Sequence, residues 1–394
     1  MKKNNEFNPL DFVNKQVSRI PPSGIRRFFD IASTMEDVIS LGVGEPDFVT
    51  PWHIRSEAVK SLEKGRTYYT ANAGLMELRK EIATYLSDTV KVSYDPAREI
   101  VVTVGASEAL DAALRALVEP GDEVLIPEPS FVCYKPCTLL AGGIPVPIET
   151  TAEDGFRLTP ELLQKAITEK TKVLVLPYPN NPTGAVMTKE DLEQIVPIIK
   201  EANIMVISDE IYSELTYFGN HVSIASLDGM RDRTVLINGF SKAFAMTGWR
   251  LGFACAHPDV LSAILKIHQY GIMSAPTFSQ YAAIEALRHG RSDIERMKEE
   301  YNIRRKFLVD ALNEMGLSCF NPSGAFYVFP SIEKFGMTSE DFCQTLLSEQ
   351  RLAVVPGTAF GESGEGYVRI SYAYSKESIA KALQRLEAFA KEHL

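Results

Sequence analysis

The stretch Glu99-Ile100-Val101-Val102-Thr103-Val104-Gly105-Ala106-Ser107 decides the fold class of this sequence. Five consecutive β-branched residues, from Ile100 to Val104, indicate a buried strand. Gly105 ends this strand, and apolar residues at helical spacing follow it. A strand that passes through a glycine directly into a helix is typical of sheets in which strands and helices alternate. We therefore expect an α/β fold.

Further apolar runs of strand length lie on both sides of this unit, and stretches with helical character separate them. The expected strands cover residues 122–126, 173–176, 204–207, 235–237 and 251–254. We expect the first of these to end at Pro127, because proline cannot donate to a sheet ladder. Strands that are apolar along almost their whole length indicate a parallel sheet covered by helices on both faces. The expected large domain spans residues 48–295.

The character of the chain changes after about residue 295. A long charged stretch at 294–315 has helical periodicity and could bridge two domains. Shorter elements follow, with strands expected at 325–329 and 367–371 and helices at 339–350 and 376–392. The first 45 residues carry no sheet pattern of their own. We therefore expect a smaller α+β domain built from residues 1–47 and 296–394.

Composition limits the function classes that remain open. The chain has 394 residues, with 45% apolar and 23% charged residues, which fits a globular protein of two domains. A net charge of −10 argues against a nucleic-acid-binding surface. No apolar run has the length of a signal core or a membrane span. Five cysteines without disulfide or zinc spacing predict reduced thiols, no metal site and a cytoplasmic location.

Polar residues gather where the expected strands end. Because ligands in open α/β sheets bind beyond the carboxyl ends of the strands, these residues are candidates for one common crevice. The crevice could receive a lysine, an aspartate, a tyrosine, an asparagine and a helix N-terminus. The stretches are Gly105-Ala106-Ser107, Asn180-Asn181-Pro182-Thr183-Gly184, Asp209-Glu210-Ile211-Tyr212 and Ser241-Lys242.

Residues 241–252, SKAFAMTGWRLG, resemble the cofactor-lysine signature of class I/II aminotransferases. Three further motifs stand along the chain in the order that this family has: PNNPTG at 179–184, SDEIY at 208–212 and YVRIS at 367–371. The resemblance begins at GVGEPD, residues 42–47. It is strongest to the bacterial branch with aromatic, alanine and N-acetyl-diaminopimelate aminotransferases. The resemblance implies a fold-type I transferase with a mostly parallel seven-stranded sheet, dependence on pyridoxal 5′-phosphate (PLP) and a homodimer.

The resemblance also implies roles for residues around the cofactor ring. Lys242 would form the Schiff base and move the substrate proton, and Asp209 would keep the ring nitrogen protonated. Tyr212, expected on the same face of a starting helix, and Asn181 would bind the 3-oxygen of the cofactor, and Phe131 would stack on its ring. Taken singly, these residues have ordinary interpretations as a helix cap, core aromatics and a turn.

Another group of residues resembles the phosphate site of the family. Gly105, Ala106 and Ser107 would offer backbone amides at a helix N-terminus, and Arg250 would add a cation. Tyr69 would reach the phosphate from the neighbouring subunit. Ser241 is a further cofactor-binding candidate. The sequence departs from the family at Gly239, where many relatives have a serine that contacts the phosphate.

Substrate-binding residues are implied in the same way. Arg369 matches the arginine that binds the substrate α-carboxylate through a two-pronged contact, and Asn181 touches the same group in relatives. Gly44 resembles a glycine whose backbone approaches the substrate closely. Ile25 lies in a strip that closes over the substrate in this branch and suits apolar side chains, whereas the neighbouring Arg26 would suit an acidic one.

Three hypotheses about the function of this protein remain. The first is an aminotransferase that moves the amino group of an aromatic or neutral L-amino acid to an oxo acid such as 2-oxoglutarate by a ping-pong cycle. An aspartate, alanine or N-acetyl-diaminopimelate substrate is the alternative within this class. The second is a PLP-dependent carbon–sulfur lyase. The third is a non-catalytic sensor domain, which the acidic charge and the lack of an expected DNA-binding module disfavour.

Overall fold

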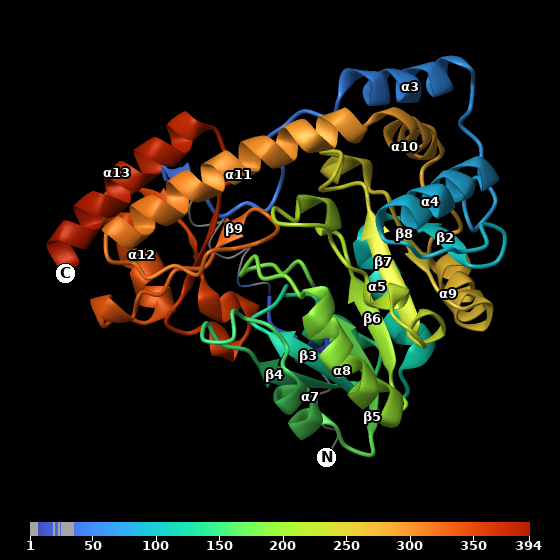
Figure 1. Cartoon of the computed structure of the whole chain (residues 1–394), viewed down its shortest axis with the longest axis horizontal. Helices are drawn as coiled ribbons and strands as arrows, with labels where there is room; N and C mark the ends of the chain where they lie inside the picture. The colour runs from blue at the N-terminus through green and yellow to red at the C-terminus, as the bar shows by residue number, and fades with distance from the viewer. Residues whose placement is uncertain (1–6, 19, 23, 25–34) are drawn as a thin grey trace.

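A seven-stranded sheet forms the centre of the protein, in the order β2-β8-β7-β6-β5-β3-β4. The computed structural model describes residues 7–18, 20–22, 24 and 35–394. Figure 1 shows the sheet with its flanking helices. The strands are β2 (Ile100–Thr103), β3 (Glu123–Glu128), β4 (Ile144–Glu149), β5 (Thr171–Leu176), β6 (Met205–Asp209), β7 (Thr234–Gly239) and β8 (Gly252–Cys255). The predicted α/β fold with a seven-stranded sheet is confirmed.

Both faces of the sheet are buried, as the apolar strands predicted. In β5, Val173 and Val175 pack on one face with helices α5 (Gly105–Leu117) and α9 (Pro258–Gly271). Leu174 and Leu176 pack on the other face with α8 (Lys189–Glu201). Six of the seven strands run in the same direction: β2, and the adjacent strands from β4 through β3, β5 and β6 to β7. Strand β8 runs antiparallel to β2 and β7. It can do so because a turn, and not a crossover helix, connects it to β7.

The structure differs from the expected strands at two places. Strand β4 contains Pro145 and Pro147, which hid it in the sequence. It lies at the edge of the sheet, where a strand tolerates proline. Pro127 does not end β3, which continues to Glu128. Pairing of β3 with β5 stops at Leu125, so the missing N–H of Pro127 costs no bond on that side.

Helices cover the sheet and give the connections between its parallel strands. Helix α5 follows β2 with no cap from a side chain, and α8 begins with a capping box made by Thr188 and Asp191. The helices of this region are α3 (Trp52–Glu63), α4 (Met76–Thr89), α5 (Gly105–Leu117), α6 (Tyr134–Leu140), α7 (Pro160–Ala166), α8 (Lys189–Glu201), α9 (Pro258–Gly271) and α10 (Thr277–His289).

A second region lies at the far end of the long helix α11 (Arg291–Glu314), which runs from beside α10 towards α12 (Ser339–Gln350) and α13 (Lys376–His393) (Figure 1). It contains the sheet β11-β12-β9, formed by Val355–Pro356, Val368–Ser371 and Tyr327–Val328. Strand β1 (Ile39–Ser40) pairs with β10 (Leu352–Ala353). The division at 47/48 and 295/296 stays a prediction, and α11 crosses its second limit.

The sequence analysis also made expectations about the cysteines and about membrane-spanning segments. The cysteines at positions 133, 137, 255, 319 and 343 are all free thiols in the structure. Within the described ranges, no helix combines the length and the apolar character that crossing a bilayer requires.

Candidate active site

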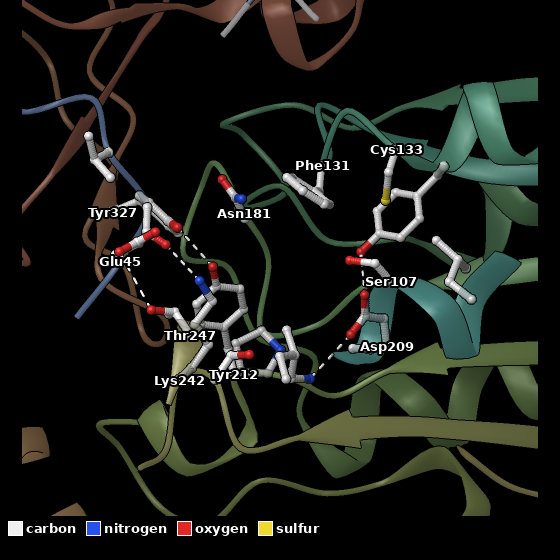
Figure 2. Close-up of a pocket in the computed structure, with 18 of the residues that line it drawn as sticks. Glu45, Ser107, Phe131, Cys133, Asn181, Asp209, Tyr212, Lys242, Thr247 and Tyr327 are labelled. Atoms are coloured by element: carbon white, nitrogen blue, oxygen red, sulfur yellow. Dashed lines mark hydrogen bonds between the residues drawn. The ribbon is translucent and has the colours of Figure 1, made fainter. Parts of the chain in front are cut away.

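A cavity of about 530 Å³ lies at the carboxyl ends of the central strands, between the sheet and the second region. Figure 2 shows Asp209 and Ser107 on one side of it and Glu45 and Tyr327 on the other. The cavity is where the sequence predicted a crevice. The predicted residues that line it are Gly44, Ala106, Ser107, Phe131, Asn181, Asp209, Tyr212, Ser241, Lys242, Arg250 and Arg369.

Lys242 lies in the turn after β7, and its side chain points into this cavity (Figure 2). Its Nζ donates to the carbonyl oxygen of Gly44 at 2.6 Å. Burial lowers the pKa of Lys242 to about 8, and the carboxylate of Glu45 opposes that shift. A lysine with such a pKa has a sizeable uncharged fraction near neutral pH, which is the form that attacks a carbonyl carbon.

Asp209 is the last residue of β6 and is held by two donors. The hydroxyl of Tyr134 donates to Oδ2 at 2.9 Å, and the backbone N–H of Ile211 donates to Oδ1 at 3.2 Å. Burial raises the pKa of Asp209 to about 6, and both hydrogen bonds work against that shift. The carboxylate is therefore positioned to accept a proton or pair with a cation inside the cavity. Sequence reasoning missed Tyr134, which no motif marked.

Tyr212 corrects one detail of the sequence analysis. No helix starts at Asp209, because the chain makes a turn after β6 and only a short 3-10 helix begins at Ser213. Tyr212 precedes that helix, and its hydroxyl lies 2.8 Å from the hydroxyl of Tyr327. Burial and this neighbour raise the pKa of Tyr212 well above its usual value. Tyr327 was not predicted, because its position depends on packing of the second region.

Gly105 and Arg250 meet at the N-terminus of α5. Both have a left-handed backbone, with φ of +79° at Gly105 and 52° at Arg250. A Cβ on Gly105 would lie 2.8 Å from a guanidinium nitrogen of Arg250, so only glycine leaves room for that side chain. No side chain caps α5, which leaves the amides of its first turn available to a ligand. A cation and a helix N-terminus together make an anion site.

Arg369 lies on β12 and is 2% exposed. Its Nη1 donates to Oδ1 of Asn181 at 2.8 Å, and its Nη2 donates to the carbonyl of Gly42. The rings of Tyr327 and Phe360 pack against the guanidinium at 4.5 and 4.8 Å. Its Nε is buried and has no hydrogen-bond partner. A fixed arginine with an unmatched donor is suited to bind a carboxylate.

Two of the predicted residues in the described part of the chain do not line the cavity. Gly105 lies next to the guanidinium of Arg250 but is not part of the wall. Tyr69 is 76% exposed and does not line the cavity of its own chain. Ile25, with Arg26, falls outside the described residues. Gly44 does reach the cavity, and a Cβ there would collide with the hydroxyl of Tyr327, which explains the glycine.

The fold and the cavity define an α/β protein with a partly buried lysine between two anion-binding groups. Residues 36–386 match the family model for aminotransferase class I and II. The chain belongs to this family and is an aminotransferase. It is 56% identical to a putative aminotransferase, YugH, of Bacillus subtilis (strain 168), over 96% of this chain and 98% of that one.

Two further relatives have more specific names. An aspartate aminotransferase of Pyrococcus abyssi is 50% identical over 97% of both chains. The crystal structure of an aromatic aminotransferase from Pyrococcus horikoshii OT3 superposes with a TM-score of 0.89, at 49% identity, over 93% of this chain and 99% of that one. The predicted fold-type I architecture is confirmed by this likeness.

Membership of this family implies dependence on PLP, and the cavity fits that group. PLP carries an aldehyde, a basic ring nitrogen and a phosphate. Three groups that suit these parts face one cavity. They are the amine of Lys242, the carboxylate of Asp209, and the anion site formed by Arg250 and the N-terminus of α5. The space that Gly105 leaves for the Arg250 side chain is consistent with a built phosphate site.

Proposed function

We propose that this aminotransferase binds PLP in the described cavity and that Lys242 bonds to the cofactor aldehyde. One observation carries the proposal: the partly buried amine of Lys242, with its lowered pKa, faces the same cavity as the Asp209 carboxylate and the Arg250 guanidinium. A lysine on the open surface would keep its ordinary pKa and would not share a cavity with these groups.

In this proposal, each side chain holds one part of the cofactor. Arg250, Ser107 and the amides of Ala106 and Ser107 bind the phosphate, with Ser241 in the same wall. Asp209 pairs with the protonated ring nitrogen, which gives the ring its capacity to accept electrons from the substrate. The absent serine at Gly239 shifts more of the phosphate binding to Arg250 and the helix.

The 3-oxygen and the ring faces involve other residues. Tyr212 and Asn181 donate to the 3-oxygen, and Phe131 packs on the ring. Tyr327, whose hydroxyl is 2.8 Å from that of Tyr212, orients the tyrosine. Lys242 completes this group because its amine lies between Gly44 and the ring of Tyr212, which is 5.6 Å from Nζ.

The substrate and its proton are handled by two residues. Arg369 binds the α-carboxylate through its guanidinium edge, and Asn181 shares that contact. Lys242, when free of the cofactor, would be the base that takes the proton from the substrate Cα and the acid that gives it back. Because the two half-reactions use the same residues, amino donor and oxo-acid acceptor bind in turn, as a ping-pong cycle requires.

We propose aromatic or neutral L-amino acids as donors and 2-oxoglutarate as an acceptor. Among the described residues that line the cavity, the cations are Lys242, Arg250 and Arg369, and each already has a role. A distal carboxylate would meet Glu45 in the same wall. The name of the aromatic relative supports this choice. Aspartate is the second candidate, because a relative with 50% identity is named for it.

We further propose a cytoplasmic homodimer. Tyr69 is exposed in the single chain, and so are Tyr68 beside it and Tyr270 and Met273 at the end of α9. The hydroxyl of Thr277 donates to the carbonyl of Tyr68, which holds this strip against the start of α10. An exposed apolar surface of this kind is suited to a second copy, whose cavity Tyr69 would then reach. The free cysteines fit a reducing compartment.

The absorbance spectrum of the purified protein tests the proposal. We expect a visible band from the lysine-bound cofactor, loss of that band with an aromatic amino acid, and its return with 2-oxoglutarate. Lys242→Ala should lack the band, whereas Lys266→Ala, an exposed lysine on α9, should keep it. Absence of the band in the wild-type protein with added PLP would refute the role of Lys242. Conversion by dicarboxylic amino acids alone would refute the substrate choice.

A further inference from the structure

A buried histidine–carboxylate pair lies behind the proposed phosphate site. His268 is on α9, which packs against α5, and Glu108 is in the first turn of α5. The two side chains are 0% and 14% exposed, and His268 Nδ1 lies 2.6 Å from Glu108 Oε1. Neither residue lines the cavity. No step of the proposed reaction uses them, so their burial needs another explanation.

The hydrogen bonds of the pair determine where its protons lie. His268 Nε2 is 2.9 Å from the carbonyl oxygen of Asn72, which can only accept, so Nε2 carries a hydrogen. Glu108 Oε2 accepts the backbone N–H of Val104 at 2.5 Å. One proton therefore lies between Nδ1 and Oε1, and with it every donor of the pair meets an acceptor. The pair then has no net charge, as imidazolium with carboxylate or as neutral imidazole with carboxyl.

The position of Glu108 creates an electrostatic conflict. It directly follows Ser107, so its carboxylate stands at the same helix N-terminus that the phosphate would occupy. Its Oε2 uses the N–H of Val104 at that helix start. A negative charge there competes with a second anion for the positive end of the helix, and it repels that anion in a poorly solvated site.

We propose that His268 is a positioning residue whose positive charge cancels that of Glu108, so that the N-terminus of α5 can hold a dianionic phosphate. The inference rests on the proposed function, because it takes PLP as the ligand. Without the imidazolium, Glu108 still accepts the N–H of Val104, but its charge opposes the phosphate. The second hydrogen bond of His268 also holds Asn72, in the strip that carries Tyr69.

The test compares two ligands that differ only in the phosphate. Affinities of the full-length chain, with cofactor removed, are measured for PLP and for pyridoxal from the visible band, in the wild type and in His268→Gln, Glu108→Gln and the double variant. We expect His268→Gln to weaken PLP on the order of tenfold, as one uncompensated charge would, and to leave pyridoxal nearly unchanged. Glu108→Gln should bind PLP at least as tightly as the wild type, and the double variant should return close to wild-type affinity.

The outcomes separate charge compensation from simple structural support. Equal weakening of PLP and pyridoxal by His268→Gln, or a double variant weaker than His268→Gln, would overturn the inference. If His268→Gln does not fold, the double variant decides, because it must keep the wild-type ratio of PLP to pyridoxal affinity. If the wild-type chain gives no visible band with either ligand, the proposed function itself is wrong.

Discussion

Replacing Tyr134 by phenylalanine removes one hydroxyl and leaves the ring that packs edge-on against Phe131. The hydroxyl donates to Asp209 at 2.9 Å, and both groups are buried. Asp209 must stay ionised to pair with a protonated ring nitrogen. The variant therefore tests how the protein keeps a buried carboxylate charged without adding a cation beside it.

The size and sign of the effect follow from the hydrogen bond. A bond to a charged acceptor contributes about 1.5–3 kcal/mol, which corresponds to about 1–2 pKa units. Burial has already raised the pKa of Asp209 to about 6, and the Tyr134 bond lowers it. Losing the bond raises the pKa further. The ionised form exists above that pKa, so activity is lost at a higher pH as the solution is acidified.

The measurement is kcat/KM as a function of pH. We expect the acidic limb of the Tyr134→Phe profile to move up by about 1–2 pH units relative to the wild type. Tyr85→Phe is a matched control, because the Tyr85 hydroxyl donates to the Glu214 carboxylate at 2.7 Å but does not line the cavity. It should leave the limb in place. An unmoved limb in an active Tyr134→Phe enzyme would refute the role given to this bond.

Three further predictions concern the cofactor, the substrate and the subunit contact. Arg369→Lys should raise KM for both amino and oxo acids on the order of tenfold or more, because lysine cannot make the two-pronged contact. Steady-state kinetics with both substrates measure this change, and an unchanged KM would contradict the prediction. Gly105→Ala should lose PLP faster on dialysis, because its Cβ would lie 2.8 Å from Arg250, whereas Gly65→Ala, at φ +69° in open space, should not. Mixing Tyr69→Ala with Lys242→Ala chains should restore activity above that of either alone, because one site of the mixed dimer is intact; no gain would place Tyr69 in its own chain's site.

Local patterns predicted the elements whose stability is local. The helix expected at 339–350 is α12, Ser339–Gln350, because its apolar positions and the cap from Thr338 are neighbours in the chain. Strand β4 could not be found in this way. Its prolines are tolerated because β4 lies at the edge of the sheet. The order of the strands in the sheet cannot be derived from the residues of β4 alone.

The site divides along the same line. Lys242, Asp209 and Arg369 were found because they stand in motifs of the family, and all three line the cavity. Tyr134 and Tyr327 carry no such mark. Each lies far in sequence from the residue that it contacts. The hydrogen bonds of Tyr134 with Asp209 and of Tyr327 with Tyr212 could therefore not be predicted before the fold was known.

The sequence by itself determined the alternation of strands and helices and the family, and it supplied the residues with proposed chemical roles, because periodicity and motifs depend on neighbours along the chain. Only the tertiary structure decided the electrostatic state of those residues. The lowered pKa of Lys242 and the raised pKa of Asp209 both arise from burial, which exists only once the two regions close over the cavity. The pairing of His268 with Glu108, 160 positions apart, likewise depends on the packing of α9 against α5.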